Sequence, residues 1–150
     1  MNTVKTTKVV IVDDHPLVRE GLVLRLSLEG DLEVVGEADT AERALALAKA
    51  ESPDLMIIDL RLREGDGIEL VKAIKSRFPS IRMLVFSCFD ESLYAERVLR
   101  AGASGYLNKQ EAGDGLIEAV RTVLAGGRHV SPALMRKLVS QALGDAEIVA

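Results

Sequence analysis

Five polar side chains in this 150-residue sequence follow directly on short apolar runs. They are Asp13 and Asp14 after "VVIV", Asp59 after "LMII", Ser87 after "RMLVF" and Lys109 after "GYLN". Carboxylates packed together raise one another's pKa unless a cation compensates their charge. Because hard divalent cations prefer oxygen ligands, the three aspartates predict a site for Mg²⁺ or Mn²⁺.

Such a site favours phosphoryl transfer. An aspartate beside Mg²⁺ can attack phosphorus and form an aspartyl-phosphate, and Asp59 is the candidate nucleophile. The transferred group then needs positive charge and a donor, which Lys109 and Ser87 could supply. Each residue alone has an ordinary explanation, since Asp13 or Asp14 could cap a helix and Lys109 could be solvated. All five residues follow the ends of apolar runs, and this common placement favours phosphoryl transfer over the separate ordinary explanations.

The elements that must position these residues alternate between short apolar runs and stretches of helical periodicity. The apolar runs lie at residues 9–12, 32–38, 55–58, 82–86 and 105–108. Strands that alternate with helices predict a parallel sheet covered on both faces, with ligands beyond the carboxyl ends of its strands. The run at 32–38 carries Glu33 and Glu37 and is predicted to be an edge strand.

The last part of the sequence predicts a linker and a further helix. Two glycines at 126–127 end the fifth helical stretch, and Ser131 can cap a helix that begins at Pro132. The apolar face of that helix comprises Met135, Leu138, Val139 and Ala142. We expect one domain over residues 8–126, and a linker with a short amphipathic helix over 127–150. No DNA-binding domain is expected within the chain.

Composition narrows the class of protein. The sequence is 48% apolar and 28% charged, and no apolar run approaches the roughly 20 residues of a membrane span. The net charge of −4 argues against a nucleic-acid binder. From position 114 onward, basic and acidic residues balance: Arg121, Arg128, Arg136 and Lys137 against Asp114, Glu118, Asp145 and Glu147. Cys88 is the only cysteine, which fits the reducing cytoplasm, and we expect it to be buried or half-buried.

Four blocks, "VVIVDDHPLVREGL", "PDLMIIDLRLREGDGIEL", "MLVFSCFDE" and "ASGYLNKQ", occur in this order. Together they resemble the signature blocks of bacterial response-regulator receiver domains. "DDHPLVREGL", "GYLNK" and the tail "AVRTVLAGGRHVSP" resemble the NarL/FixJ (LuxR-type) subfamily in particular. The resemblance covers roughly residues 8–132. It implies an α/β fold in three layers, doubly wound around a five-stranded parallel sheet of order 2-1-3-4-5, as in flavodoxin-like proteins.

The resemblance also implies a role for each candidate residue. Asp59 matches the aspartate that takes a phosphoryl group from a sensor histidine kinase. Asp13 and Asp14 match the acidic pair that holds Mg²⁺, together with Asp59 and the main-chain carbonyl at the position of Arg61. Lys109 matches the lysine that binds the phosphoryl group.

Two further residues match the switch of this family. Ser87 matches the hydroxyl that turns toward the phosphoryl group, and Tyr106 matches the switch aromatic. The resemblance implies a phosphoprotein that catalyses only its own phosphorylation and dephosphorylation. Its partners would be a sensor histidine kinase and a second copy of the chain, with DNA contacted only through an output domain. His15 is interpreted as a loop residue, because imidazole suits metals other than Mg²⁺.

Three alternatives remain open. An aspartyl-phosphate phosphatase usually has a second aspartate two residues after the nucleophile, where this sequence has Arg61. A nucleotide-binding module needs a glycine-rich loop after the first strand, where this sequence has "DDHPLVREG". The third alternative is a receiver that acts only by docking and does not need phosphorylation. The intact set of site residues is the one observation against it.

Overall fold

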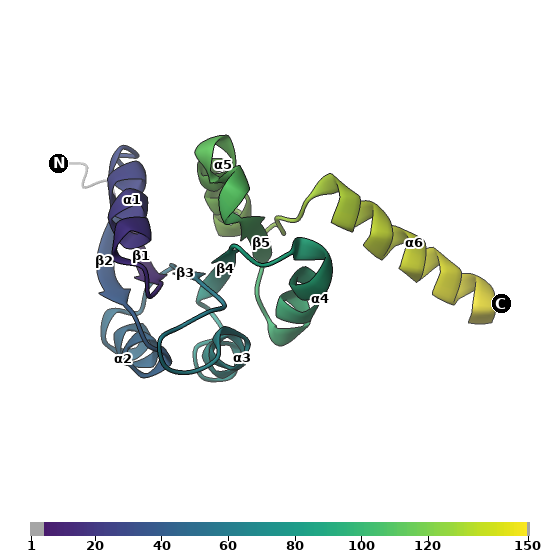
Figure 1. Ribbon diagram of the computed structural model, residues 1–150, viewed down its shortest axis with the longest axis horizontal. Coiled ribbons are helices and arrows are strands. Elements are labelled where there is room, and N and C mark those ends of the chain that lie inside the picture. The colour runs from purple at the N-terminus through teal and green to yellow at the C-terminus, as the bar shows by residue number, and fades with distance from the viewer. Residues whose placement is uncertain (1–4, 150) are drawn as a thin grey trace.

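The computed structural model describes residues 5–149, apart from the side chains at 112, 114 and 145–149 (Figure 1). The side chains of Asp114, Asp145 and Glu147, used above in the charge balance, therefore lie outside the described residues. In chain order the elements are β1 (Thr7–Val12), α1 (Pro16–Ser27), β2 (Leu32–Ala38), α2 (Ala41–Glu51), β3 (Leu55–Ile58), α3 (Gly67–Arg77), β4 (Arg82–Ser87), α4 (Glu91–Ala101), β5 (Gly105–Asn108), the short 3₁₀ helix η1 (Lys109–Glu111), α5 (Ala112–Leu124) and α6 (Pro132–Val149).

The strands form one parallel sheet in the order β2-β1-β3-β4-β5, which confirms the predicted topology. Helices α1 and α5 cover one face, and α2, α3 and α4 cover the other (Figure 1). The predicted edge strand is β2, which pairs only with β1 in this sheet. The fold therefore has the three predicted layers.

Strand β1 shows why the apolar runs are continuous. Val9 and Ile11 pack with α1 and α5, whereas Val10 and Val12 pack with the helices on the opposite face. All of these side chains have 0% exposure. Successive residues of a strand point to opposite faces, so a strand covered on both faces needs apolar residues at every position.

The connection from α5 to α6 is more closely packed than the sequence indicated. The main-chain N–H of His129 donates to the carbonyl of Ser104, and residues Gly105 and His129 form a parallel bridge at the open edge of β5. Ser131 caps α6 as predicted, because its Oγ accepts from the N–H of Leu134 at 3.1 Å. Leu134 itself is 5% exposed and packs in the core on the α4 side of the sheet.

Helix α6 then leaves the body of the domain (Figure 1). Met135, Val139 and Leu143 on this helix are exposed, so most of its apolar face has no cover within the described residues. Cys88 is also exposed, and the expectation that it is buried or half-buried was wrong, because it lies just past β4 in the loop before α4. Among the described helices, none combines the length and hydropathy of a membrane span.

Candidate functional site

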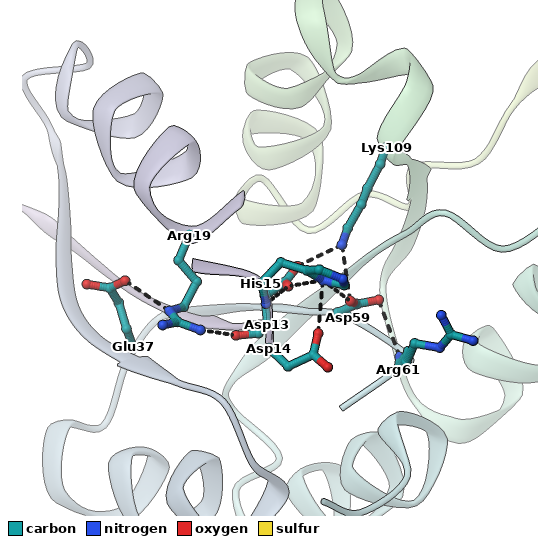
Figure 2. A network of polar contacts seen from close by, with 8 residues as sticks. All are labelled: Asp13, Asp14, His15, Arg19, Glu37, Asp59, Arg61 and Lys109. Atoms are coloured by element: carbon teal, nitrogen blue, oxygen red, sulfur yellow. Dashed lines mark hydrogen bonds and ion pairs between the residues drawn. The ribbon is translucent and has the colours of Figure 1, made fainter. Parts of the chain in front are cut away.

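The three aspartates meet at the carboxyl edge of the sheet (Figure 2). Ligand atoms of Asp13, Asp14, His15 and Asp59 all lie within 4.8 Å of one another. The main-chain N–H of Asp13 donates to the carbonyl of Ala38 at 2.9 Å, and that of Asp59 donates to Val12 at 2.8 Å. The strand pairing thus continues one residue past β1 and β3 and fixes both carboxylates in place.

Lys109 supplies the positive charge that these carboxylates need. Its Nζ lies 2.8 Å from Asp13 Oδ2 and 3.1 Å from Asp59 Oδ2 (Figure 2). Burial raises the pKa of Asp59, although the charge of Lys109 opposes the rise. Burial also works against the charged form of Lys109, but its contacts with Asp13 and Asp59 outweigh that effect and raise its pKa. The lysine therefore stays charged beside two buried carboxylates.

The donor set fits a hard divalent cation. Asp13 is 1% exposed and its Oδ2 pairs with Lys109, whereas the buried Oδ1 of Asp14 accepts no hydrogen bond from any described residue. Lys109 Nζ lies 2.8 Å from Asp13 Oδ2, and His15 Nδ1 lies 2.9 Å from Asp14 Oδ1. Buried carboxylate oxygens without donors are costly unless a cation binds them.

The two aspartates at the start of the site are not helix caps. The N-cap of α1 is His15, and no side chain makes a cap hydrogen bond there. Asp13 Oδ1 accepts instead from the main-chain N–H of His15 at 2.8 Å, which orients the carboxylate. By contrast, Asp66 and Asp90 do cap α3 and α4. The ordinary explanation for Asp13 and Asp14 is therefore wrong.

Two residues contact the site although no role in it was predicted for them from the sequence. His15 was interpreted as a loop residue, but its Nδ1 lies 3.1 Å from Asp13 Oδ1 and 3.9 Å from Asp59 Oδ2. Arg19 donates to the main-chain carbonyl of Asp13 at 2.7 Å and pairs with Glu37 of β2 (Figure 2). Arg19 lies one turn into α1, close after the aspartates in the sequence, and this spacing could have predicted its contact with them.

The loop after β3 contributes a main-chain donor. The N–H of Arg61 donates to Asp59 Oδ1 at 3.3 Å, and the Arg61 guanidinium lies over the ring of Phe89 at 5.7 Å. The assignment of the Arg61 carbonyl as a metal ligand stays a prediction.

The two candidate switch residues contact the same loop. Ser87 is 1% exposed, and its Oγ accepts from the main-chain N–H of Phe89 at 3.0 Å. The hydroxyl of Tyr106 donates to the carbonyl of the same Phe89. Burial raises the pKa of Tyr106 to about 12. A movement of the Ser87–Phe89 loop would therefore change contacts of both residues.

The family of the chain follows from comparison with known proteins. A family model described as "Response regulator receiver domain" matches residues 9–121. The chain belongs to this family. It is 37% identical over 134 residues to the transcriptional regulatory protein DegU of Brevibacillus brevis, an alignment that covers 89% of this chain and 57% of DegU. The chain thus spans little more than half the length of that relative.

Solved structures agree with the assignment. A LuxR-family response regulator from Aurantimonas sp. SI85-9A1 superposes with a TM-score of 0.84 at 33% identity, covering 93% of this chain and 99% of that one. The isolated REC domain of RcsB from Salmonella enterica serovar Typhimurium, with phosphomimetic BeF3⁻, gives a TM-score of 0.79 at 28% identity. That alignment covers 88% of this chain and 98% of the RcsB domain. The chain is a receiver of the NarL/FixJ subfamily, a signalling module rather than an enzyme that turns over a substrate.

Proposed function

We propose that this receiver takes a phosphoryl group on Asp59 from a sensor histidine kinase, and that the change controls a transcriptional output domain or self-association. The observation that carries the proposal is the position of Asp59. Its carboxylate is 3% exposed, lies 3.1 Å from Lys109 Nζ and shares one cluster with Asp13 and Asp14.

The proposed reaction is a displacement at phosphorus. A carboxylate oxygen of Asp59 attacks, the bond from phosphorus to the donor breaks, and its electron pair leaves with the donor. Asp13, Asp14 and Asp59, with the Arg61 carbonyl, would hold Mg²⁺ or Mn²⁺. When bound, this cation neutralises charge that develops on the phosphoryl oxygens.

The chain's own groups do the remaining work. Lys109 Nζ, already between Asp13 and Asp59, can contact a phosphoryl oxygen without a large movement. The Oγ of Ser87 accepts a hydrogen bond from Phe89, and its hydroxyl, which also lies within hydrogen-bond reach of Tyr106, can donate to a phosphoryl oxygen once it turns. Turning that hydroxyl toward the phosphoryl group would break its contact with the Phe89 N–H. Because Tyr106 donates to the Phe89 carbonyl, the same loop movement would reach β5.

Mass spectrometry after incubation with acetyl phosphate and Mg²⁺ tests the phosphoacceptor. The intact mass of the parent should rise by one phosphoryl group, and that of Asp59→Asn should not. Asp54→Asn is the matched control, because Asp54 lies just before the same strand, at its opposite end. This control should be labelled like the parent. Equal labelling of Asp59→Asn would show that the nucleophile is another residue.

The proposed output is a second copy of the chain or a separate domain, and not DNA contacted by the receiver itself. The net charge of −4 opposes contact with phosphates, and the exposed apolar face of α6 requires a partner. We further propose residues 8–126 as the receiver domain, and 127–150 as a linker and helix. Sedimentation with and without a phosphoryl mimic tests self-association. Dimerisation that is identical in both states would favour the alternative of a docking receiver that works without phosphorylation.

A further inference from the structure

We propose that His15 is a ligand of the divalent cation, and that its nitrogen makes the site favour first-row transition ions such as Mn²⁺ and Co²⁺ over Mg²⁺. The proposal deepens the function proposed above, because it concerns the same cation. It goes beyond that function in adding a residue and a metal preference that the acidic residues alone do not give.

The spacing of the donor atoms supports ligation. An octahedral ion with bonds of about 2.1 Å holds neighbouring ligand atoms about 3 Å apart. His15 Nδ1 lies 2.9 Å from Asp14 Oδ1 and 3.1 Å from Asp13 Oδ1, which is the spacing of neighbouring ligands. Its distance of 3.9 Å from Asp59 Oδ2 still fits two ligands on one ion. The imidazole therefore faces the same point as the carboxylates (Figure 2).

Hydrogen bonding accounts for only part of this arrangement. His15 Nδ1 has hydrogen-bond geometry with Asp13 Oδ1, but the Asp14 Oδ1 only 2.9 Å away accepts no aligned hydrogen bond from any described residue. Asp13 Oδ2, on a carboxylate that is 1% exposed, pairs with Lys109 Nζ at 2.8 Å and does not contact His15. A buried Asp14 oxygen without a hydrogen-bond donor among the described residues, with an imidazole nitrogen at ligand spacing from it, fits a shared cation better than a set of hydrogen bonds.

The local backbone holds His15 in this position. His15 is the N-cap of α1 and precedes Pro16, whose ring restricts the residue before it to extended conformations. Its φ of −98° and ψ of 110° are extended. Its main-chain N–H donates to Asp13 Oδ1 at 2.8 Å, which ties the loop to the first carboxylate. The side chain is 50% exposed, so the ring can adjust when a cation enters.

The chemical consequence is selectivity. Mg²⁺ takes oxygen ligands and keeps its waters, so one imidazole adds little to its binding. Imidazole is a good ligand for first-row transition ions, so a nitrogen in the site raises their affinity more than that of Mg²⁺. Removal of His15 should therefore weaken transition-ion binding selectively.

Pulsed EPR on the Mn²⁺-loaded chain tests ligation directly. A coordinated imidazole gives a ¹⁴N modulation of the Mn²⁺ signal. The chain has only two histidines, so His15→Gln is the test variant and His129→Gln is its matched control. We expect the modulation in the parent and in His129→Gln, and its loss in His15→Gln. An absent modulation in the parent, or one that persists in His15→Gln, would overturn the proposal.

Calorimetric titration tests selectivity. In His15→Gln, affinities for Mn²⁺ and Co²⁺ should fall at least about tenfold, the lower end of the loss seen even for outer-sphere partners, with Mg²⁺ affected less than about twofold. An equal loss for all three ions would mean that His15 only positions the aspartates, and would overturn the proposal.

Acetyl phosphate labelling with Mg²⁺ separates this proposal from the proposed function. If Asp59 of the parent is not labelled while the nitrogen modulation is present, the phosphoacceptor assignment fails and the ligand assignment stands. If Asp59 is labelled while the modulation is absent, the ligand assignment fails and the phosphoacceptor assignment stands.

Discussion

The main-chain N–H of Tyr106 donates to the main-chain carbonyl of His129, and the two atoms are 2.8 Å apart. This bond extends the sheet past β5 and covers part of an edge that would otherwise be open. Two residues later, the N–H of Ser131 donates to Glu91 Oε1 of α4 at 2.9 Å. The start of α6 is therefore joined to both the strand and the helix that flank the proposed switch. A change at Tyr106 or in α4 has a direct route to α6.

The first prediction concerns Leu134, whose side chain anchors α6. Because it is 5% exposed and packs in the core, Leu134→Ala should lower the free energy of unfolding by about 2–5 kcal/mol. Leu143→Ala on the same helix is the control. Leu143 is 62% exposed, so its replacement should cost less than about 0.5 kcal/mol. Urea denaturation followed by circular dichroism measures both. Equal, small losses would show that the start of α6 does not pack on the domain.

The second prediction concerns Lys109. Lys109→Met leaves the buried carboxylates of Asp13 and Asp59 without their cation, which should destabilise the metal-free protein by on the order of 3 kcal/mol. The pKa of Asp59 should rise further, since the charge of Lys109 holds it down. Lys72→Met is the control, because Lys72 pairs with Glu69 on the surface. That control should change stability by less than about 1 kcal/mol. If both variants lose equally little in urea denaturation, Lys109 does not compensate the cluster.

The third prediction concerns the pH dependence of stability at Tyr106. Burial raises its pKa to about 12, above the ordinary value of 10.0. A group with a raised pKa in the folded state contributes stability that is complete below the unfolded pKa and is lost as pH rises through the folded pKa. The parent should therefore lose stability between pH 10 and about 12, and Tyr106→Phe should lose less over this window. Denaturant midpoints at several alkaline pH values measure the difference. Parallel curves for the two proteins would contradict the assignment.

Much of the fold was predictable because its signals are local. Each buried strand is a continuous apolar run in the sequence, and a stretch with helical periodicity follows each one. The layers and the edge strand β2 can therefore be predicted from this pattern alone. The convergence of Asp13, Asp14 and Asp59 follows from the same logic, because parallel strands end at one edge of the sheet. The strand order came from resemblance to a family, since no local signal specifies which strands are neighbours.

The residues that were missed were missed for different reasons. Leu134 belongs to a helix whose other apolar residues are largely exposed, and its burial requires the earlier pairing of His129 with β5. His15 was judged by the chemistry of its side chain, whereas its position is set by the main-chain bond to Asp13. Cys88 was judged by its residue type, although the turn after β4 places it outside.

The last prediction concerns Asp14, the aspartate that Lys109 does not contact. Without a cation, its charge repels Asp13 and Asp59, and its Oδ1 has no aligned hydrogen-bond donor among the described residues. Asp14→Asn removes this repulsion, so the metal-free variant should gain about 1 kcal/mol and melt about 2–4 °C above the parent. The stabilisation that Mg²⁺ adds should be smaller in Asp14→Asn than in the parent, because the variant has lost a ligand. A cation at about a hundred times its Kd stabilises by about 2.7 kcal/mol, and Asp14→Asn should keep only part of that gain.

Differential scanning fluorimetry with and without millimolar Mg²⁺ measures both effects, and Asp54→Asn serves as the control. Asp54 lies at the opposite end of β3, and its Oδ2 accepts from the main-chain N–H of Lys8 at 2.8 Å. Its replacement removes one negative charge without touching the cluster, so it should leave the Mg²⁺ gain unchanged. A parent that melts at the same temperature with and without Mg²⁺ would mean that the carboxylates do not bind the cation. A lower melting temperature for metal-free Asp14→Asn would mean that Lys109 already compensates the whole cluster, and that Asp14 contributes to the fold through a contact other than charge.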